Sequence, residues 1–572
     1  MKARLVFLGA LAATSVIACD GLLGINLLDG GPPPKDAGRL DVAVDDSGAA
    51  DDAGSNDASE DASDDAPPPG SDFALSAGGQ RVTIVRGGSA EVPISVGWGN
   101  AVAEAVTVTA PGLPAGVTAD PLVIIPPATG GTLTLHATAT ATLTVTGTVA
   151  IMASGGAFTH VVALPLVVRD PPGILDLTFG VKGISTVALP GGLAYAAIGG
   201  YGLTFQADGS IVYCGNGKFG DNQEIVLGRL TTDGSIDTGF GDHGLVITNV
   251  PGHAVDVCAS VKVLPSGSLA LAGFTQDPNS TIAAHGFMAA QFTDAGAVDD
   301  NFGTGGFFWQ VMGVDSKAND FVVEPDGHLV LGGFSTPPSA AGELTFLRLQ
   351  STGKLDLTFG PDGAGTALFP AWIGNGEMAV FSNGNVLSSS LTSTSFLNVQ
   401  VDPEGAIDSA YGVDGGATGP APPAFTGASG MILQSDGSTV LAGAGGDPTA
   451  VQLARFDAFG RLDGTFGKGG LASTTIPALP GGKTSVGAIA LTADGGFAVA
   501  TLLPTHTPIG VVRYDATGAL DLSFAGIGYA GIAGYSYGDA VAVDAWGRIV
   551  IAAITMNTLQ NTASVVLARY WP

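Results

Sequence analysis

The motif that decides the fold is LDLTFG at Leu175–Gly180, because it returns through the rest of the chain. Its aspartate recurs, in altered copies of the motif, at spacings of 61, 62, 57, 52, 55 and 58 residues: Asp237, Asp299, Asp356, Asp408, Asp463 and Asp521. An aromatic residue follows each aspartate three positions later: Phe179, Phe240, Phe302, Phe359, Tyr411, Phe466 and Phe524. Seven copies in one phase indicate seven structural units.

Two further motifs recur in the same phase. A polar turn before an apolar strand is centred on Gly209, Gly267, Gly327, Gly384, Gly437, Gly495 and Gly547. An Arg or Gln followed by an apolar or aromatic residue ends each unit: Arg229, Gln291, Arg348, Gln400, Arg455, Arg513 and Arg569. Each unit holds four short β-rich segments between glycine turns, as in a four-stranded propeller blade. We therefore expect an all-β chain with a seven-bladed β-propeller over residues 171–572.

The ends of the array also predict that the ring closes. In the inner units, the Arg or Gln precedes an aspartate by eight positions. Asp176 lacks such a residue before it, and Arg569 lacks an aspartate after it. Closure would bring these two residues together.

These motifs resemble the delta-60 repeat of bacterial exported proteins, a family associated with β-propellers. The resemblance covers about residues 173–572 and implies the fold, but it supplies no established catalytic residue. We expect the repeated aromatic residues to pack between adjacent blades. We expect the repeated aspartates to be turn or cap groups, some facing the arginine eight residues earlier; calcium binding is the alternative.

The N-terminus has the features of a bacterial export signal. Two basic residues precede a largely apolar run, Leu5–Ile17, which is too short to span a membrane as a helix. The run VIAC at Val16–Cys19 resembles the lipobox of bacterial lipoproteins, in which the cysteine thiol receives a diacylglycerol. We expect residues 1–18 to be a signal peptide and the lipid on Cys19 to anchor the protein to the bacterial cell envelope. An ordinary signal peptide is the alternative, and the outer membrane or cell surface is favoured over the inner membrane.

The composition of residues 19–72 indicates a disordered acidic linker. From Asp29 to Asp72 the chain has 13 acids against two bases, and its first Phe after the leader is Phe73. Such a segment cannot bury enough apolar area to offset the entropy of ordering. It would space the folded part from the lipid headgroups; calcium binding by its acids is the alternative.

Residues 73–170 predict an immunoglobulin-like β-sandwich. Six or seven short alternating segments, such as Arg81–Val85 and Ala90–Val96, are separated by Gly and Pro. The stretch GLPAGV at Gly112–Val117 resembles one common in bacterial immunoglobulin-like domains of secreted enzymes and surface proteins. Such a domain would act as a spacer. Carbohydrate binding is the alternative, although the strands lack a row of exposed aromatic residues.

Charge and motif content exclude several function classes. The net charge of -30, from 51 acids and 21 bases, argues against a nucleic-acid partner. The seven histidines show no His-x-x-x-His spacing and the cysteines no Cys-x-x-Cys spacing, so the sequence predicts no metal site and no cofactor. Catalysis stays open, because propellers can assemble sites from distant loops. Cys214 and Cys258 either form a disulfide or remain two buried thiols.

The long, variable connections of the units are expected to gather on one rim, which we take as the binding surface. An aromatic or imidazole side chain occupies six of the expected loop positions: Phe219, His253, His285, Trp372, Tyr535 and Tyr537. The first hypothesis is a noncatalytic binding or scaffolding platform for an unknown protein or polysaccharide partner. The alternative is a polysaccharide-acting hydrolase or lyase with its site at one propeller mouth. These loops could also merely tolerate drift.

Overall fold

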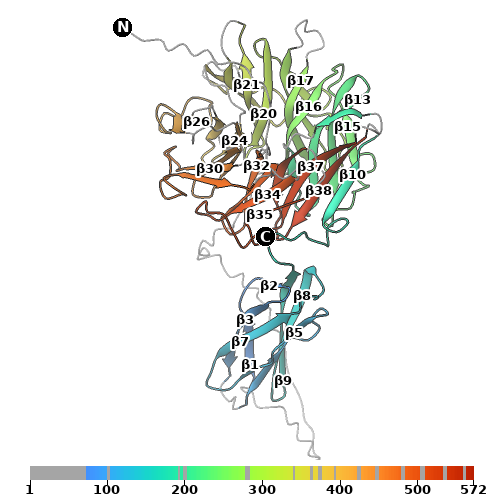
Figure 1. The fold of residues 1–572 in the computed structure, drawn as a ribbon, viewed down its shortest axis with the longest axis vertical. Helices are drawn as coiled ribbons and strands as arrows, with labels where there is room; N and C mark the ends of the chain where they lie inside the picture. The colour runs from blue at the N-terminus through green and yellow to red at the C-terminus, as the bar shows by residue number, and fades with distance from the viewer. Residues whose placement is uncertain are drawn as a thin grey trace, which may run out of the picture. The chain divides into compact units, whose positions relative to one another are not determined.

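The structure is a computed structural model that describes residues 72–99, 104–190, 193–197, 202–276, 284–338, 342–360, 365–370, 377–391, 395–420, 427–444, 450–477, 484–502, 509–532, 537–557 and 562–572. Within these ranges every regular element is a strand (Figure 1), which confirms the all-β class. These ranges accordingly contain no helix long and apolar enough to cross a membrane. The chain divides into two compact units between Val168 and Arg169.

Two sheets that share one hydrophobic core make up the first unit. Their strand orders are β1-β3-β7-β5 and β2-β9-β8-β4-β6. The bounds are β1 (Phe73–Ala77), β2 (Val82–Val85), β3 (Ser89–Trp98), β4 (Val106–Thr109), β5 (Val117–Ala119), β6 (Leu122–Ile124), β7 (Gly130–Ala137), β8 (Thr144–Gly155) and β9 (Phe158–Arg169). In β3 alternate residues Val92, Ile94 and Val96 are buried while their neighbours are exposed, as the period of two in a strand requires.

The second unit contains seven sheets among its described residues, here numbered in chain order. Sheet 1 has β11 (Leu193–Ala197), β12 (Leu203–Phe205), β13 (Ile211–Phe219), β14 (Asn222–Leu230) and β15 (Leu245–Thr248). Sheet 2 has β16 (Asp256–Val263), β17 (Leu269–Gln276), β18 (His285–Phe292) and β19 (Phe307–Gln310). Sheet 3 has β20 (Asp315–Val323), β21 (Leu329–Thr336), β22 (Glu343–Leu349) and β23 (Thr366–Pro370).

The remaining four sheets repeat this antiparallel arrangement. Sheet 4 has β24 (Glu377–Val380), β25 (Val386–Leu391), β26 (Ser395–Val401) and β27 (Gly416–Pro420). Sheet 5 has β28 (Gly427–Leu433), β29 (Thr439–Ala444), β30 (Ala450–Phe456) and β31 (Leu471–Thr475). Sheet 6 has β32 (Ser485–Leu491), β33 (Phe497–Leu502), β34 (Ile509–Tyr514) and β35 (Tyr529–Ile532). Sheet 7 has β36 (Tyr537–Val543), β37 (Ile549–Asn557) and β38 (Thr562–Tyr570), completed by β10 (Ile184–Ala188).

Sheet 7 joins the two ends of this unit (Figure 1). Strand β10 pairs antiparallel with β38, with Thr186 opposite Val566. The carboxylate of Asp176 accepts a hydrogen bond of 2.8 Å from Nε of Arg569, so the prediction that these residues lie together is confirmed. Asp176 also accepts bonds from the backbone nitrogen and hydroxyl of Thr178.

The repeated aromatic residues pack between neighbouring sheets, as predicted. Phe179 lies in a core shared by sheets 7 and 1, and Phe240 lies in the core shared by sheets 1 and 2. The same holds for Phe302, Phe359, Tyr411, Phe466 and Phe524 at the next five boundaries. Burying one such side chain contributes about 1.5–3 kcal/mol, so the motif stabilises the contacts between sheets.

The glycine turns that precede the second strand of each sheet need a left-handed backbone. Gly209 has φ 84°, and its nitrogen donates to the carbonyl of Gln206 to close the turn between β12 and β13. Residues with a side chain rarely adopt this φ, which explains why the turn keeps a glycine in every unit.

Candidate functional site

The seven sheets present two rims with different connections. Because consecutive strands are antiparallel, the turn between strands one and two lies at the same end as the connection between strands three and four. This end, with the turns at Gly209 and Gly267, is called the short-turn rim. The opposite end, with the connections between strands two and three and between successive sheets, is called the long-loop rim.

The predicted binding residues do not all lie where the sequence suggested. Phe219, His285 and Tyr537 were expected in loops, but they are strand ends, because hairpin pairing continues to Phe219 opposite Asn222 and to His285 opposite Gln276. His253 does precede its strand, on the long-loop rim. Trp372 and Tyr535 lie outside the described residues, as does Cys19.

Phe219 packs as a half-buried side chain against the core that sheets 7 and 1 share. Only the backbone of Tyr537 is described, as the first residue of β36. The structure therefore brings two of the six predicted residues, His253 and His285, to one end of a single sheet.

His253 is held in a buried polar cluster on this end of sheet 2. It is 5% exposed, its Nδ1 lies 2.6 Å from the hydroxyl of Thr275, and its ring contacts the edge of Trp309 with centroids 4.6 Å apart. Asp256 pairs opposite Thr275 in the strand register and accepts a hydrogen bond of 3.2 Å from the nitrogen of Val250. Burial raises the pKa of Asp256 to about 6.

His285 belongs to a second cluster on the same rim. Both its Nδ1 and its backbone nitrogen lie 2.8 Å from Oδ1 of Asp315. Burial raises the pKa of the Asp315 carboxyl, but the two bonds from His285 outweigh burial and hold it below its usual range. The ammonium of Lys317 lies 4.5 Å from the ring centroid of Phe274, and burial lowers its pKa. These clusters place imidazole, aromatic and cationic groups together at the long-loop rim.

The short-turn rim is built from repeated Arg–Asp ion pairs. In each of the five units that have an arginine near the end of the third strand, this arginine pairs with the aspartate eight residues later or with its closing equivalent: Arg229–Asp237, Arg348–Asp356, Arg455–Asp463, Arg513–Asp521 and Arg569–Asp176. The other carboxylate oxygen accepts the backbone nitrogen two residues on, as at Gly239 and Thr465. The expectation that these aspartates are turn groups facing an arginine is thus confirmed for these units.

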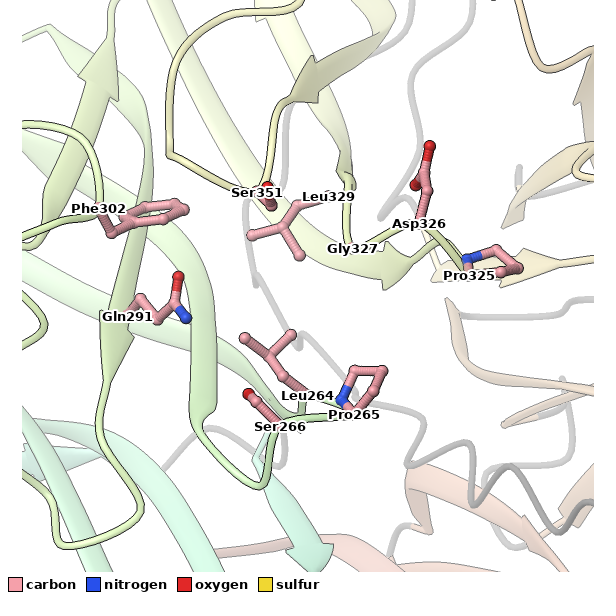
Figure 2. A pocket seen from close by; sticks show the side chains of 10 residues that line it. All are labelled: Leu264, Pro265, Ser266, Gln291, Phe302, Pro325, Asp326, Gly327, Leu329 and Ser351. Atoms are coloured by element: carbon pink, nitrogen blue, oxygen red, sulfur yellow. The ribbon is translucent and has the colours of Figure 1, made fainter.

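A pocket of about 270 Å³ opens on the short-turn rim at the boundary of sheets 2 and 3. In Figure 2, Phe302 and Gln291 lie on one side of the pocket and Asp326 and Pro325 on the other. Ser351 lies at the same boundary and lines the pocket with them.

Among the described residues, one group combines three potential metal ligands: Glu324, Asp326 and His328, whose ligating atoms lie within 4.8 Å of one another. Oδ2 of Asp326 lies 2.8 Å from Nδ1 of His328. The guanidinium of Arg348 lies among these groups, with its Nε 2.8 Å from Oε2 of Glu324 and 3.5 Å from Oδ2 of Asp356. Arg348 already pairs with Glu324 and Asp356, so the arrangement is an ion-pair network and we assign no metal to it.

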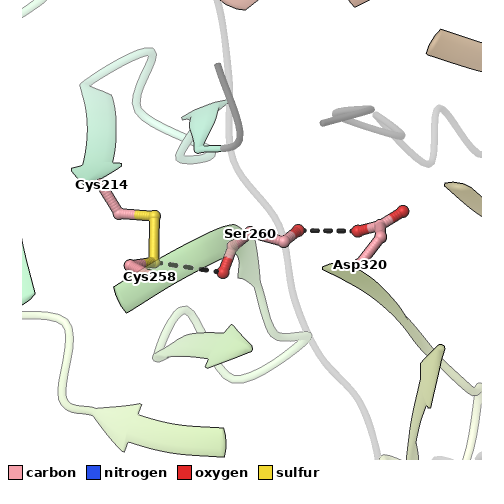
Figure 3. The surroundings of a disulfide bond; sticks show 4 residues. All are labelled: Cys214, Cys258, Ser260 and Asp320. Atoms are coloured by element: carbon pink, nitrogen blue, oxygen red, sulfur yellow. Dashed lines mark hydrogen bonds between the residues drawn. A yellow bond between two sulfur atoms is a disulfide. The ribbon is translucent and has the colours of Figure 1, made fainter. Parts of the chain in front are cut away.

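Cys214 of β13 and Cys258 of β16 form a disulfide between sheets 1 and 2 (Figure 3). Of the two outcomes that the sequence left open, the structure therefore shows the bonded one. On the other side of β16, the hydroxyl of Ser260 donates to Oδ1 of Asp320 at 2.7 Å. Asp320 also accepts the backbone nitrogen of Met378, which ties sheets 2, 3 and 4 together.

Three features of the two rims were not predicted from the sequence, although two of them left a signal in it. The neighbours of His253, which are Thr275 and Trp309, come from other strands, and only the register brings them together. His328 stood out as the one histidine in a repeated turn. Gln291 and Gln400 both depart from the arginine of the other five units, so the sequence marked Gln291 as unusual but did not distinguish it from Gln400.

Comparisons with known proteins bear on the fold alone. The sequence model of a family described as "Domain of unknown function (DUF5122) beta-propeller" matches residues 206–240, which run from a repeated turn to the repeated aromatic residue. This match supports a propeller-type repeat protein. No curated protein matches the chain. Among solved structures, a DUF4784 family protein from Bacteroides caccae ATCC 43185 is 10% identical, with a TM-score of 0.24 over 80% of this chain and 95% of that one. A score this low supports no argument.

Proposed function

We propose that the protein is a lipoprotein anchored through Cys19 to the bacterial cell envelope, and that its second unit acts as a noncatalytic binding or scaffolding platform. In this proposal residues 19–72 are a disordered tether and residues 73–170 an immunoglobulin-like spacer. Residues 171–572 form a seven-bladed propeller of delta-60 repeats, and the partner is a protein or polysaccharide.

One observation carries the proposal for the propeller: the first strands of the sheets contact one another in a cycle. Strand β12 contacts β16, and the contacts continue through β20, β24, β28, β32 and β36 back to β12. Such a cycle is what the inner strands of a propeller make around its axis. The pairing of β10 with β38 supports the same arrangement.

The long-loop rim supports a binding role. Loops on a rigid scaffold can vary without cost to the core, which is how repeat proteins build recognition surfaces. Trp309 is 39% exposed there, beside His253. His253 bonds Thr275 of its own sheet and His285 bonds Asp315 of sheet 3, so both imidazoles are held in place, which suits a preformed binding surface.

The disulfide supports export to the cell envelope. Disulfides persist in oxidising compartments and are rare in the bacterial cytosol. The Cys214–Cys258 bond is therefore in keeping with the export signal and the lipobox. For the first unit, two sheets around one core support an immunoglobulin-like sandwich.

The experiment compares partner capture by the full chain with capture by a variant of each rim. Trp309→Ala should abolish capture of the envelope component while the melting temperature stays nearly unchanged. Asp208→Ala, an exposed residue of the short-turn rim, is the matched control and should capture as the original protein does. Equal capture by all three proteins would contradict the platform on the long-loop rim. Release of new reducing ends from bound polysaccharide would contradict a noncatalytic role.

A further inference from the structure

Four arginines on the short-turn rim occupy equivalent places. Each donates from Nη1 to a backbone carbonyl of the next sheet in the cycle: Arg229 to Asp294, Arg348 to Pro403, Arg455 to Ala516 and Arg569 to Thr232. Each guanidinium also lies over the repeated phenylalanine, 4.4–5.8 Å from the ring centroid: Phe240, Phe359, Phe466 and Phe179 respectively. Three groups thus surround each guanidinium, namely an aspartate, an aromatic face and a carbonyl.

Sheet 2 keeps these three groups but has Gln291 in place of the arginine. The nitrogen of Asp299 donates to the carbonyl of Gln291 at 2.9 Å, and the nitrogen of Phe302 donates to the carbonyl of Asp299 at 3.0 Å. The same two backbone bonds measure 3.1 and 3.0 Å in sheet 1, between Asp237 and Arg229 and between Phe240 and Asp237. The backbone is therefore conserved between the two units, and the difference lies in the side chain.

The pocket lies where the guanidinium lies in the units that have an arginine. Gln291, Phe302 and Ser351 line it, and Ser351 is the position whose backbone carbonyl accepts from the arginine elsewhere in the repeat. A glutamine side chain is shorter than that of arginine and carries no charge, so the space stays open (Figure 2). The replacement of arginine by Gln291 thus accounts both for the pocket and for the absence of a positive charge in it.

We infer that this pocket binds an alkylguanidinium group, as carried by an arginine side chain. The carboxylate of Asp326 lines the pocket and supplies negative charge, and the ring of Phe302 supplies a cation–π contact. Asp299 holds the sequence position of the aspartate that pairs with the arginine in other units. Leu264 and Pro325 line the pocket with apolar surface for the methylene groups. Its volume of about 270 Å³ suits a group the size of one side chain.

Electrostatics explain why the pocket prefers this cation. Burial opposes ionisation of Asp326, but bonds from His328 and the charge of Arg348 outweigh burial, so its pKa lies below the usual range and the carboxylate stays charged. The planar guanidinium can donate to a carboxylate and a carbonyl while stacking on a ring, which an ammonium cannot do. The lining residues include no Lys or Arg.

Sheet 4 provides an internal control. It also has glutamine at this position, Gln400, but its aspartate, Asp408, accepts a hydrogen bond of 2.7 Å from Nδ2 of Asn385. Its repeated aromatic residue is Tyr411. The chain's own amide satisfies this site, so we expect it to bind no guanidinium. The inference concerns the short-turn rim and does not depend on the anchor or on the partner of the long-loop rim.

The test is calorimetric titration of the full chain with N-acetylarginine amide, with its neutral isostere N-acetylcitrulline amide as control. We expect saturable binding of one arginine derivative per chain and at least about tenfold weaker binding of the citrulline derivative, because a charged hydrogen bond is lost. Agmatine and a short arginine peptide distinguish a free metabolite from a protein side chain as the source. Equal affinity for the charged and neutral compounds would overturn the inference.

Two pocket variants and one control variant assign the binding to the pocket. Gln291→Arg should fill the pocket as in the other units, raise the melting temperature and abolish binding, whereas Gln400→Arg should leave the affinity unchanged. Asp299→Asn should weaken binding at least about tenfold with little effect on folding, because its other oxygen still accepts from the nitrogen of Asn301. Unchanged binding by Gln291→Arg, or loss of binding in Gln400→Arg, would overturn the inference.

Discussion

Replacing Asp176 by asparagine tests the join between the first and last sheets. Its side chain is fully buried and contacts two buried guanidinium groups, with Oδ2 2.8 Å from Nε of Arg569 and 3.2 Å from Nη1 of Arg548. Asparagine fills the same space and can still accept from Thr178, but it removes the charge. Burial, followed by the charge of Arg548, lowers the pKa of Arg569 to about 10, which shows how poorly this position is solvated.

The expected loss of stability follows from the burial of these groups. Leaving a buried charge without its partner costs about 3–5 kcal/mol. The unfolding entropy of about 400 residues is about 0.8 kcal/mol per kelvin, so a loss of about 4 kcal/mol lowers the melting temperature by about 5 °C.

Scanning calorimetry of the full chain measures this change, with Asp237→Asn as the matched control. Asp237 makes the same contact, 2.7 Å from Nε of Arg229, but its side chain is 22% exposed. Solvent reaches this pair in part, so its loss should cost less than the loss of the fully buried Asp176 pair. Equal shifts for the two variants, or no shift for Asp176→Asn, would refute the buried closure.

Three further predictions concern separate features. Burial raises the folded-state pKa of Asp256 from 3.8 to about 6, so protonation of Asp256 stabilises the fold below about pH 4, and this stabilisation is lost as the pH rises through 6. Urea unfolding at pH 4.5 and 7.5 measures this loss of stability, and Asp256→Asn should abolish it. An unchanged dependence of stability on pH in the variant would contradict the prediction. The disulfide closes a loop of 44 residues, so replacing Cys214 and Cys258 by alanine should lower the unfolding free energy by about 3–4 kcal/mol. Equal stability of the original protein with and without reductant would show that the bond is absent in solution. Cys19→Ser should release the protein from membranes or leave its precursor uncleaved, and normal processing with unchanged membrane fractionation would exclude the anchor.

Features set by a repeated pattern could be predicted from the sequence. The phase of the array paired Asp176 with Arg569 across almost the whole unit, because each residue lacked the partner that its equivalents have nearby. The burial of Phe179 and its equivalents between sheets followed from their recurrence within an otherwise variable unit.

Features set by strand register could not be predicted. Phe219 and His285 were placed in loops because the sequence does not show where hairpin pairing ends, whereas the pairing continues to both residues. The contacts of His253 depend on Thr275 and Trp309, which lie on other strands of sheet 2. The pocket depends on a substitution, Gln291, whose effect emerges only when the arginines of the other units are seen in place.

Closure of the seven sheets into one propeller is tested most directly by an experimental structure of the full chain. We expect seven sheets around one axis, β10 paired with β38, and the carboxylate of Asp176 within hydrogen-bonding distance of the guanidinium of Arg569. A structure in which residues Ile184–Ala188 pair elsewhere, or in which the first strands of sheets 1 and 7 are apart, would contradict it.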